Sequence, residues 1–222
     1  MSAPIVRQLI LKDLYLLRWM VAAAIVTGGA AIAIMPLSQV SGYVGAVSLI
    51  CTLVVLNIFL VMGGVVQEKK DKVLLFILSL PVSTTQYVVA KVAANAIAFL
   101  VPWLVLTAGA IVVIDVSALP NGILPYWLAV LGYILFYYCA LLAVGLLSDS
   151  TAAHTTAIIV GNVSINLFIP FLLALPSVAG HAKGPVAVWT GDIVAILAAE
   201  ILAGALALGL AVHFRSRAGD FV

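Results

Sequence analysis

Long apolar stretches separated by short polar breaks run through the whole chain. Six of them are long enough to cross a bilayer as helices, which takes about 20 residues each. They are residues 19–36, 43–66, 87–114, 124–147, 154–175 and 192–213. The breaks between them contain Pro, Gly and polar residues of the kind that end helices. The pattern therefore predicts an all-α fold, a polytopic membrane protein with six transmembrane helices.

The composition agrees with this pattern. Of the 222 residues, 65% are hydrophobic and only 8% are charged, whereas a soluble domain carries roughly 25% charged residues. This excludes a soluble enzyme, a secreted disulfide scaffold and a disordered chain, and the net charge of +2 gives no reason to expect nucleic acid. No polar segment is long enough to fold separately. We therefore expect residues 1–222 to form a single transmembrane domain in contact with membrane lipids.

Basic residues are distributed unequally between the two predicted faces. Cytoplasmic flanks of membrane helices retain Lys and Arg, and here only Lys183 falls on the opposite face. The nine others are Arg7, Lys12, Arg18, Lys69, Lys70, Lys72, Lys91, Arg215 and Arg217. This asymmetry predicts that both termini are cytoplasmic. We expect the chain in the cell (inner) membrane.

Residues 4–18, before the first span, predict an amphipathic helix. Its polar and apolar side chains fall on two helical faces, with Gln8, Lys12, Tyr15 and Arg18 on one and Val6, Ile10, Leu14 and Leu17 on the other. Such a helix lies in the membrane interface and turns its basic side toward anionic headgroups. A plain helical extension of the first span is the alternative.

The break between the second and third spans is much longer than a tight connection needs. Its residues 68–80 begin with charged side chains and continue with apolar residues at the spacing of one helical face. The charged residues are Glu68, Lys69, Lys70, Asp71 and Lys72, and the apolar ones are Val73, Phe76, Ile77 and Leu80. We interpret the segment as a docking element for a cytosolic partner. A charged loop followed by a short surface helix is the alternative.

This segment resembles a motif of the membrane subunits of ABC-2 type ATP-binding cassette transporters, which lies between their second and third spans. In that family the motif reads roughly E-K-E-D-G-T-L-E-F-L-L-S-L-P-V-S, and residues 68–83 here read E-K-K-D-K-V-L-L-F-I-L-S-L-P-V-S. The chain departs from it at Lys72, Val73 and Leu75, where Gly, Thr and Glu are common. The six-span layout and the N-terminal amphipathic helix, called the elbow helix in that family, agree with the resemblance.

The resemblance implies a permease subunit of an ATP-driven exporter. Residues 68–80 would then contain a cytoplasmic coupling helix that fits a separate cytosolic ATPase subunit. The implied contact residues are Glu68, Lys69, Lys70, Asp71, Lys72, Phe76 and Leu80. ATP and Mg would be bound by that partner, with no cofactor in this chain. Six spans are half of what the family uses, so a second permease subunit is implied, as a homodimer or a heterodimer.

The chain itself carries no motif for catalysis. It has no G-x-x-x-x-G-K-[ST] sequence to bind ATP phosphates, no G-x-S-x-G and no H-E-x-x-H, so we do not expect an enzyme. His154, His181 and His213 fall at different faces of the predicted topology and cannot converge, so we expect no metal site.

Three polar residues inside spans are candidates for a transport pathway. Glu200 lies in the sixth span, where a charge is costly and often marks a pathway, and Asn162 and Asn166 lie one turn apart in the fifth. A structural Glu and amides that bond neighbouring helices are the alternatives. Beside Glu200, alanines at every fourth position predict close helix packing within the subunit. They are Ala199, Ala203, Ala207 and Ala211.

The spans are mostly Ala, Val, Leu and Gly, without an acidic or basic ring. This favours an amphipathic or hydrophobic cargo, such as a peptide, a drug or a lipid-like molecule. Two other functions stay open. One is a proton-coupled secondary transporter that uses Glu200, and the other is a membrane assembly protein that transports nothing.

Overall fold

Six long helices form the bundle in the computed structural model, which describes residues 3–67, 84–117 and 119–217. They are α1 (Ala3–Ile34), α2 (Gln39–Val61), α5 (Thr84–Val116), α6 (Leu124–Leu147), α7 (Thr151–Ala174) and α9 (Gly191–Arg217). Each is long and apolar enough to cross a membrane, and no strand occurs among the described residues. The predicted all-α fold with six spans is confirmed.

Three short elements complete the described chain. The π-helical turn η1 (Met62–Val66) continues α2, the 3₁₀ turn η2 (Asn121–Ile123) precedes α6, and α8 (Pro176–Ala179) follows α7. Helix α2 starts a turn earlier than the apolar pattern predicted, because Ser38 caps it: the Ser38 hydroxyl accepts a bond from the Ser41 backbone N–H at 3.1 Å.

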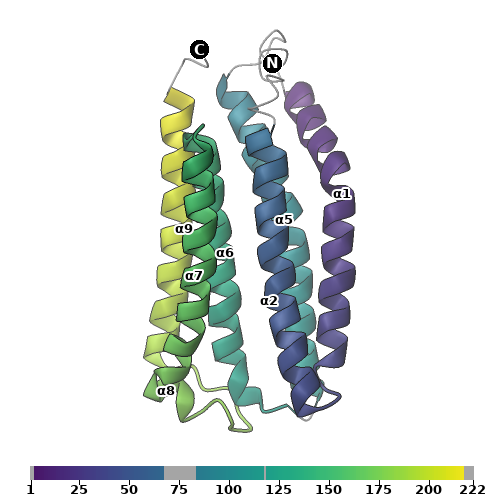
Figure 1. The fold of residues 1–222 in the computed structure, drawn as a ribbon, viewed down its shortest axis with the longest axis vertical. Coiled ribbons are helices and arrows are strands. Elements are labelled where there is room, and N and C mark those ends of the chain that lie inside the picture. The colour runs from purple at the N-terminus through teal and green to yellow at the C-terminus, as the bar shows by residue number, and fades with distance from the viewer. Residues whose placement is uncertain (1–2, 68–83, 118, 218–222) are drawn as a thin grey trace.

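The helices pack as two groups (Figure 1). Helix α1 packs against α2 and α5, α6 packs against α7 and α9, and contacts of α2 with α6 and of α5 with α9 join the groups. The start of α1 and the end of α9 lie at the same end of the bundle. We call this the basic end, since Arg7, Lys12, Arg18, Lys91 and Arg215 belong to the helix segments nearest to it. Which end faces the cytoplasm stays a prediction.

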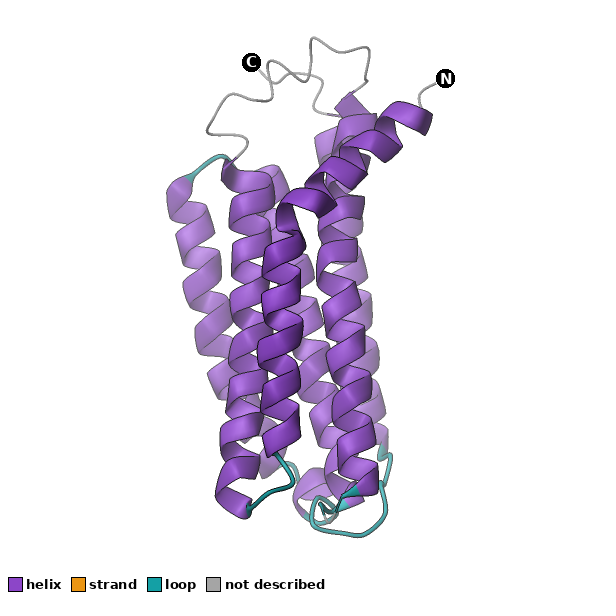
Figure 2. Ribbon diagram, turned by 90° about the vertical axis from the view of Figure 1, so that its right-hand side faces the viewer, coloured by secondary structure: helices purple, strands orange, loops and turns teal. Residues whose placement is uncertain are grey.

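The predicted elbow helix is the first part of α1, which continues into the first span without a break. Figure 2 shows that α1 bends, so that its first part leans away from the axis of the bundle. Leu17 faces the bundle with 6% of its surface exposed, whereas Tyr15 and Trp19 are exposed. The segment is thus continuous with the first span but leans away from it, and its position in the membrane interface as an elbow helix stays a prediction.

The core lies where α2, α5 and α6 meet. Leu49, Leu53 and Leu60 of α2 are fully buried there, and the ring of Phe99 on α5 stacks on that of Tyr138 on α6 with 4.1 Å between centroids. By contrast, α7 and α9 expose many large apolar side chains, including Leu167, Phe171, Ile201, Leu202 and Leu206. Surfaces of this kind are stable against lipid or another apolar helix.

The prediction that four alanines of α9 pack closely within the subunit is right for two of them and wrong for the other two. Ala211 is buried and Ala207 half-buried, but Ala199 and Ala203 are exposed. Positions spaced strictly by four drift by about 40° per step around a helix of 3.6 residues per turn. The face that packs on α6 therefore alternates its spacing and includes Ile193, Leu197, Glu200, Gly204 and Ala211.

Candidate functional site

The predicted ATPase-contacting residues lie outside the described residues. They are Glu68, Lys69, Lys70, Asp71, Lys72, Phe76 and Leu80. The structure does describe the helices that the segment connects, which are α2 with η1 before it and α5 after it. The polar contacts among these helices at the basic end form the candidate site.

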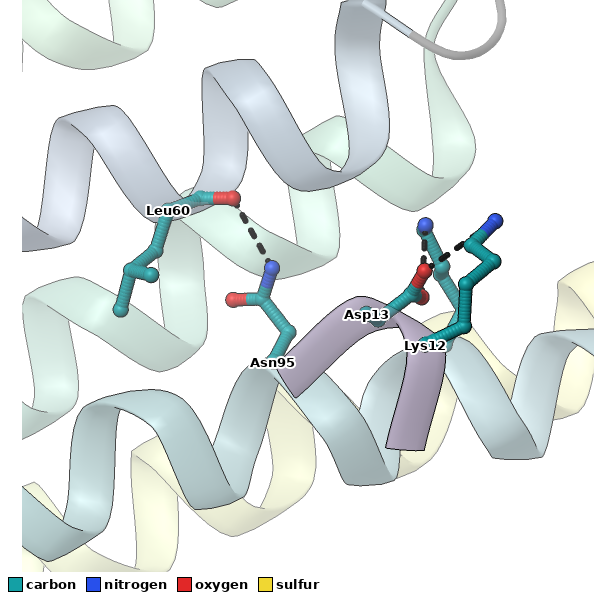
Figure 3. Close-up of polar contacts among 5 residues, drawn as sticks. Lys12, Asp13, Leu60 and Asn95 are labelled. Atoms are coloured by element: carbon teal, nitrogen blue, oxygen red, sulfur yellow. Dashed lines mark hydrogen bonds and ion pairs between the residues drawn. The ribbon is translucent and has the colours of Figure 1, made fainter. Parts of the chain in front are cut away.

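A buried ion pair joins α1 to α5. The Lys91 Nζ donates to the Asp13 Oδ2 at 2.8 Å, and the two residues are only 5% and 7% exposed. The Lys12 Nζ lies 3.3 Å from the other carboxylate oxygen (Figure 3) and is more exposed. Because burial of a lone charge is costly, each member of the pair stabilises the other in place.

Asn95, one turn farther along α5, bonds to two other helices. Its Nδ2 donates to the Leu60 carbonyl oxygen of α2 at 2.9 Å (Figure 3), and its Oδ1 accepts a bond from the Tyr138 hydroxyl of α6 at 3.2 Å. Asn95 is 2% exposed. Inside an apolar bundle such bonds have little competition from water, so this one side chain ties α5 to both α2 and α6.

The Leu60 carbonyl lies directly before the place where α2 widens into η1. There the Gln67 backbone N–H donates to the Met62 carbonyl five residues back, which is the bonding of a π-helix. A Cβ built on Gly64 would lie 2.7 Å from the Asn95 Nδ2, so the glycine allows the amide to approach the backbone. Single π-turns occur frequently at functional sites.

We call Asp13, Lys91, Asn95, Tyr138 and the Leu60 carbonyl the polar cluster. It holds no nucleophile beside a base, and no group of three or more His, Cys, Asp or Glu in the described part of the chain could hold a metal ion. The cluster instead connects helices: three hydrogen bonds, one of them within an ion pair, join α1, α2, α5 and α6.

Glu200 lies elsewhere, between α9 and α6. It is 8% exposed, and neither carboxylate oxygen has a hydrogen-bond partner among the described residues. Its Oε2 lies close against Gly132 of α6, and the Leu197 side chain also lies close to that glycine. The expectation that Glu200 faces the interior of the bundle agrees with this burial, while its role in transport stays a prediction.

Asn162 and Asn166 lie on α7. The Asn162 Nδ2 donates to the Ile158 carbonyl at 2.8 Å and lies 3.5 Å from the Tyr137 hydroxyl of α6, whose ring rests on Gly161. Asn166 is exposed, and its Nδ2 donates to the Asn162 carbonyl at 2.7 Å. These bonds fit the alternative of helix-bonding amides for Asn162, and no bond joins either residue to Glu200 within the described residues.

Sequence reasoning missed the polar cluster. A signal for it existed, since Lys91 is a long basic residue inside an apolar helix and Asp13 is the acidic residue that the predicted amphipathic helix carries. Two such residues expected near one membrane face are candidates to pair. Asn95 gave a weaker signal, because an amide in a span finds partners in many arrangements.

Most of the chain is similar to one family of known proteins. A family model described as "ABC-2 family transporter protein" matches residues 34–190, which is more than half of the chain. The matched part contains residues 68–80 and the helices α2, α5, α6 and α7, but neither Asp13 nor Glu200. No curated protein and no solved structure matches the chain.

Proposed function

Because the chain belongs to the ABC-2 family of transporter proteins, we propose that it is the membrane-spanning permease subunit of an ATP-driven exporter. Family membership and six apolar helices make it a multi-pass transporter component without a catalytic centre of its own. The family match is the observation that supports this proposal most directly. Members of the family work with an ABC ATPase component.

Energy would enter from that ATPase through residues 68–80. The partner would bind ATP and Mg, since this chain has no sequence that could bind ATP phosphates. Glu68, Lys69, Lys70, Asp71, Lys72, Phe76 and Leu80 would contact the ATPase. The position of this segment between two helices that the polar cluster joins supports the assignment.

The working assembly would contain two permease subunits. Both termini would be cytoplasmic, which the concentration of basic residues at one end of the bundle supports. The exposed apolar surfaces of α7 and α9 offer area for a second subunit, identical or similar, and for lipid. The membrane would be the cell (inner) membrane.

The cargo would be amphipathic or hydrophobic, because the helices are lined by apolar side chains almost throughout. Glu200, Asn162 and Asn166 are the residues that would contact it. Asn166 is the exposed one of the three. An exposed amide inside a membrane span would be more stable facing a pathway or a second subunit than facing lipid.

Co-expression with a candidate ABC ATPase subunit from the same organism tests the proposal. The two should co-purify in detergent, and the permease should change the ATPase rate in nanodiscs. A fourfold charge reversal of Glu68, Lys69, Lys70 and Asp71 should abolish both effects. Lys183→Glu, a charge reversal at the opposite end of the bundle, is the matched control and should leave both intact.

Two results would contradict the proposal. If the fourfold reversal leaves co-purification and the ATPase effect unchanged, residues 68–80 are not the coupling segment. If uptake into vesicles follows a proton gradient without ATP and is lost in Glu200→Gln, the chain is a proton-coupled secondary transporter. One observation favours this second function: the carboxyl group of Glu200 is buried and has no hydrogen-bond partner among the described residues.

A further inference from the structure

We propose that Asn95 is the positioning residue that makes the ends of α2 and α5 move as one body with α6, so that a push on residues 68–80 reaches the far half of the bundle. This inference rests on the proposed function, because it assigns a path to the movement that the ATPase would cause. The contacts that carry it are all between described residues.

The path begins with chain connectivity. Residues 68–83 join η1 to α5, so any displacement of that segment enters the bundle through these two helix ends. At a rise of 1.5 Å per residue, Leu60 lies about 10 Å before the end of the helical chain at Gln67, and Asn95 about 16 Å after Thr84. The Asn95 bond is thus a cross-link between the two entry points, a short way into the bundle.

The cross-link extends to a third helix. The Asn95 Oδ1 accepts from the Tyr138 hydroxyl, and the Tyr138 ring stacks on Phe99, one turn along the same face of α5, with an interplanar angle of 5°. Asn95, Phe99 and Tyr138 are each at most 2% exposed. A displacement of α6 along α5 would therefore break the hydrogen bond and shift the stacked rings.

The ion pair connects α1 to α5. Lys91 lies one turn before Asn95 on α5 and bonds to Asp13 of α1. A displacement of the start of α5 therefore also moves α1. Since α6 packs against α7 and α9, movement of α6 reaches the second group of helices.

The π-turn η1 packs together with the cross-link. It starts two residues after Leu60, its Gly64, Val65 and Val66 are buried, and it contacts α5 and α6. Gly63 has open space beside it, since a Cβ there would meet nothing within 4 Å. A displacement that enters through the end of α2 therefore acts on a turn that is already packed against α5 and α6.

The test compares ATP-dependent movement in three variants of the permease–ATPase complex in nanodiscs. Asn95→Leu removes both amide bonds, and Tyr138→Phe removes only the bond to α6 while it keeps the stacked ring. Asn57→Leu is the matched control, because Asn57 is a buried asparagine of α2 with no hydrogen-bond partner among the described residues. The readouts are ATPase rate, unfolding temperature and hydrogen–deuterium exchange of each helix with and without trapped ATP.

In the wild type and in Asn57→Leu, trapped ATP should change exchange in α5 and in α6. In Asn95→Leu and Tyr138→Phe the change in α5 near residues 86–91 should remain and that in α6 should be lost, with ATP hydrolysis continuing. A purely structural role would lower the unfolding temperature but would not separate the two helices. If Asn95→Leu does not fold, the milder Tyr138→Phe provides the same comparison.

Different results would overturn the proposed function and the role of Asn95. A wild-type chain that binds no ATPase, or whose exchange does not respond to trapped ATP, overturns the proposed function and this inference with it. A wild-type chain that responds, with the same response of α6 in Asn95→Leu and Tyr138→Phe, overturns this inference and leaves the proposed function standing.

Discussion

Asp13 and Glu200 are both buried carboxylates, yet the fold surrounds them differently. Asp13 lies between α1 and α5, where the Lys91 ammonium bonds to it at 2.8 Å and Lys12 lies 3.3 Å away. Glu200 lies between α6 and α9, where its neighbours are Gly132 and the apolar Leu197 and neither oxygen is bonded in the described chain. One junction between helices is thus joined by an ion pair, and the other by packing around a carboxyl group without hydrogen bonds.

The two carboxyl groups therefore contribute differently to the stability of the fold. A paired charge in an apolar interior becomes a strong constraint, because loss of either partner leaves the other uncompensated. An unbonded polar group contributes nothing to offset its desolvation, which costs about 1–3 kcal/mol. The stability of the contact between α1 and α5 therefore explains why position 13 is an Asp. The stability of the contact between α6 and α9 does not explain why position 200 is a Glu.

Removal of the Lys91 charge should have the largest effect on stability. Lys91→Met leaves the Asp13 carboxylate buried beside Lys12 alone, and we expect it to lower the free energy of unfolding by about 3 kcal/mol, at the lower end of the range for broken buried pairs. Denaturant titration in micelles, followed by tryptophan fluorescence, measures this loss.

Two further variants check the cause. Lys12→Met makes the same chemical change on the more exposed lysine and should cost less than about 1 kcal/mol. Asp13→Leu combined with Lys91→Met should recover most of the loss, because apolar pairs often replace buried ion pairs without penalty. Equal losses in Lys12→Met and Lys91→Met would show that the 2.8 Å contact is not what stabilises the junction.

Replacement of Glu200 should change stability in the opposite direction. Glu200→Met removes a carboxyl group without bonds and keeps the volume, so we expect the free energy of unfolding to rise by about 1–2 kcal/mol. The same titration measures it, with Glu200→Gln as the variant that keeps a polar group and should stay within about 1 kcal/mol of the wild type.

A loss of stability in Glu200→Met as large as that in Lys91→Met would remove the contrast between the two junctions. It would mean that Glu200 bonds to a group in the working assembly, such as a second subunit. A stable Glu200→Met that no longer transports cargo would instead assign Glu200 to the pathway.

The sequence predicted the helices and the burial of Glu200 because both follow from local pattern. Apolar runs of sufficient length have few folds open to them in a membrane, and a charge inside such a run avoids lipid. The Asp13–Lys91 pair could not be predicted in the same way, since its members are 78 residues apart. Their meeting depends on which helices are neighbours, and periodicity within a helix does not specify this.

Smaller differences have the same origin. The bend of α1 and the exposure of Ala199 and Ala203 follow from how α1 and α9 pack on their neighbours. The contact residues in 68–80 and the pathway role of Glu200, Asn162 and Asn166 stay predictions, because both concern partners outside this chain.

The smallest expected effect concerns the space that Gly132 provides for Glu200. In Gly132→Ala the new methyl group displaces the Glu200 Oε2, which is the end of a flexible side chain, so the penalty should be only about 1 kcal/mol. Helix propensity favours alanine by a similar amount, which should bring the net change in the free energy of unfolding close to zero. Gly209→Ala on α9, where a Cβ meets nothing within 4 Å, is the control and should show the propensity gain alone.

The double-mutant cycle with Glu200→Ala isolates the contact. Without the carboxyl group, Gly132→Ala should gain as much as Gly209→Ala does, which gives a coupling of about 1 kcal/mol between positions 132 and 200. If the two substitutions are instead additive, Glu200 does not rest against Gly132 in the bilayer and its carboxylate turns elsewhere. The junction between α6 and α9 would then be an ordinary apolar contact, and the search for a partner of Glu200 would move to the second subunit.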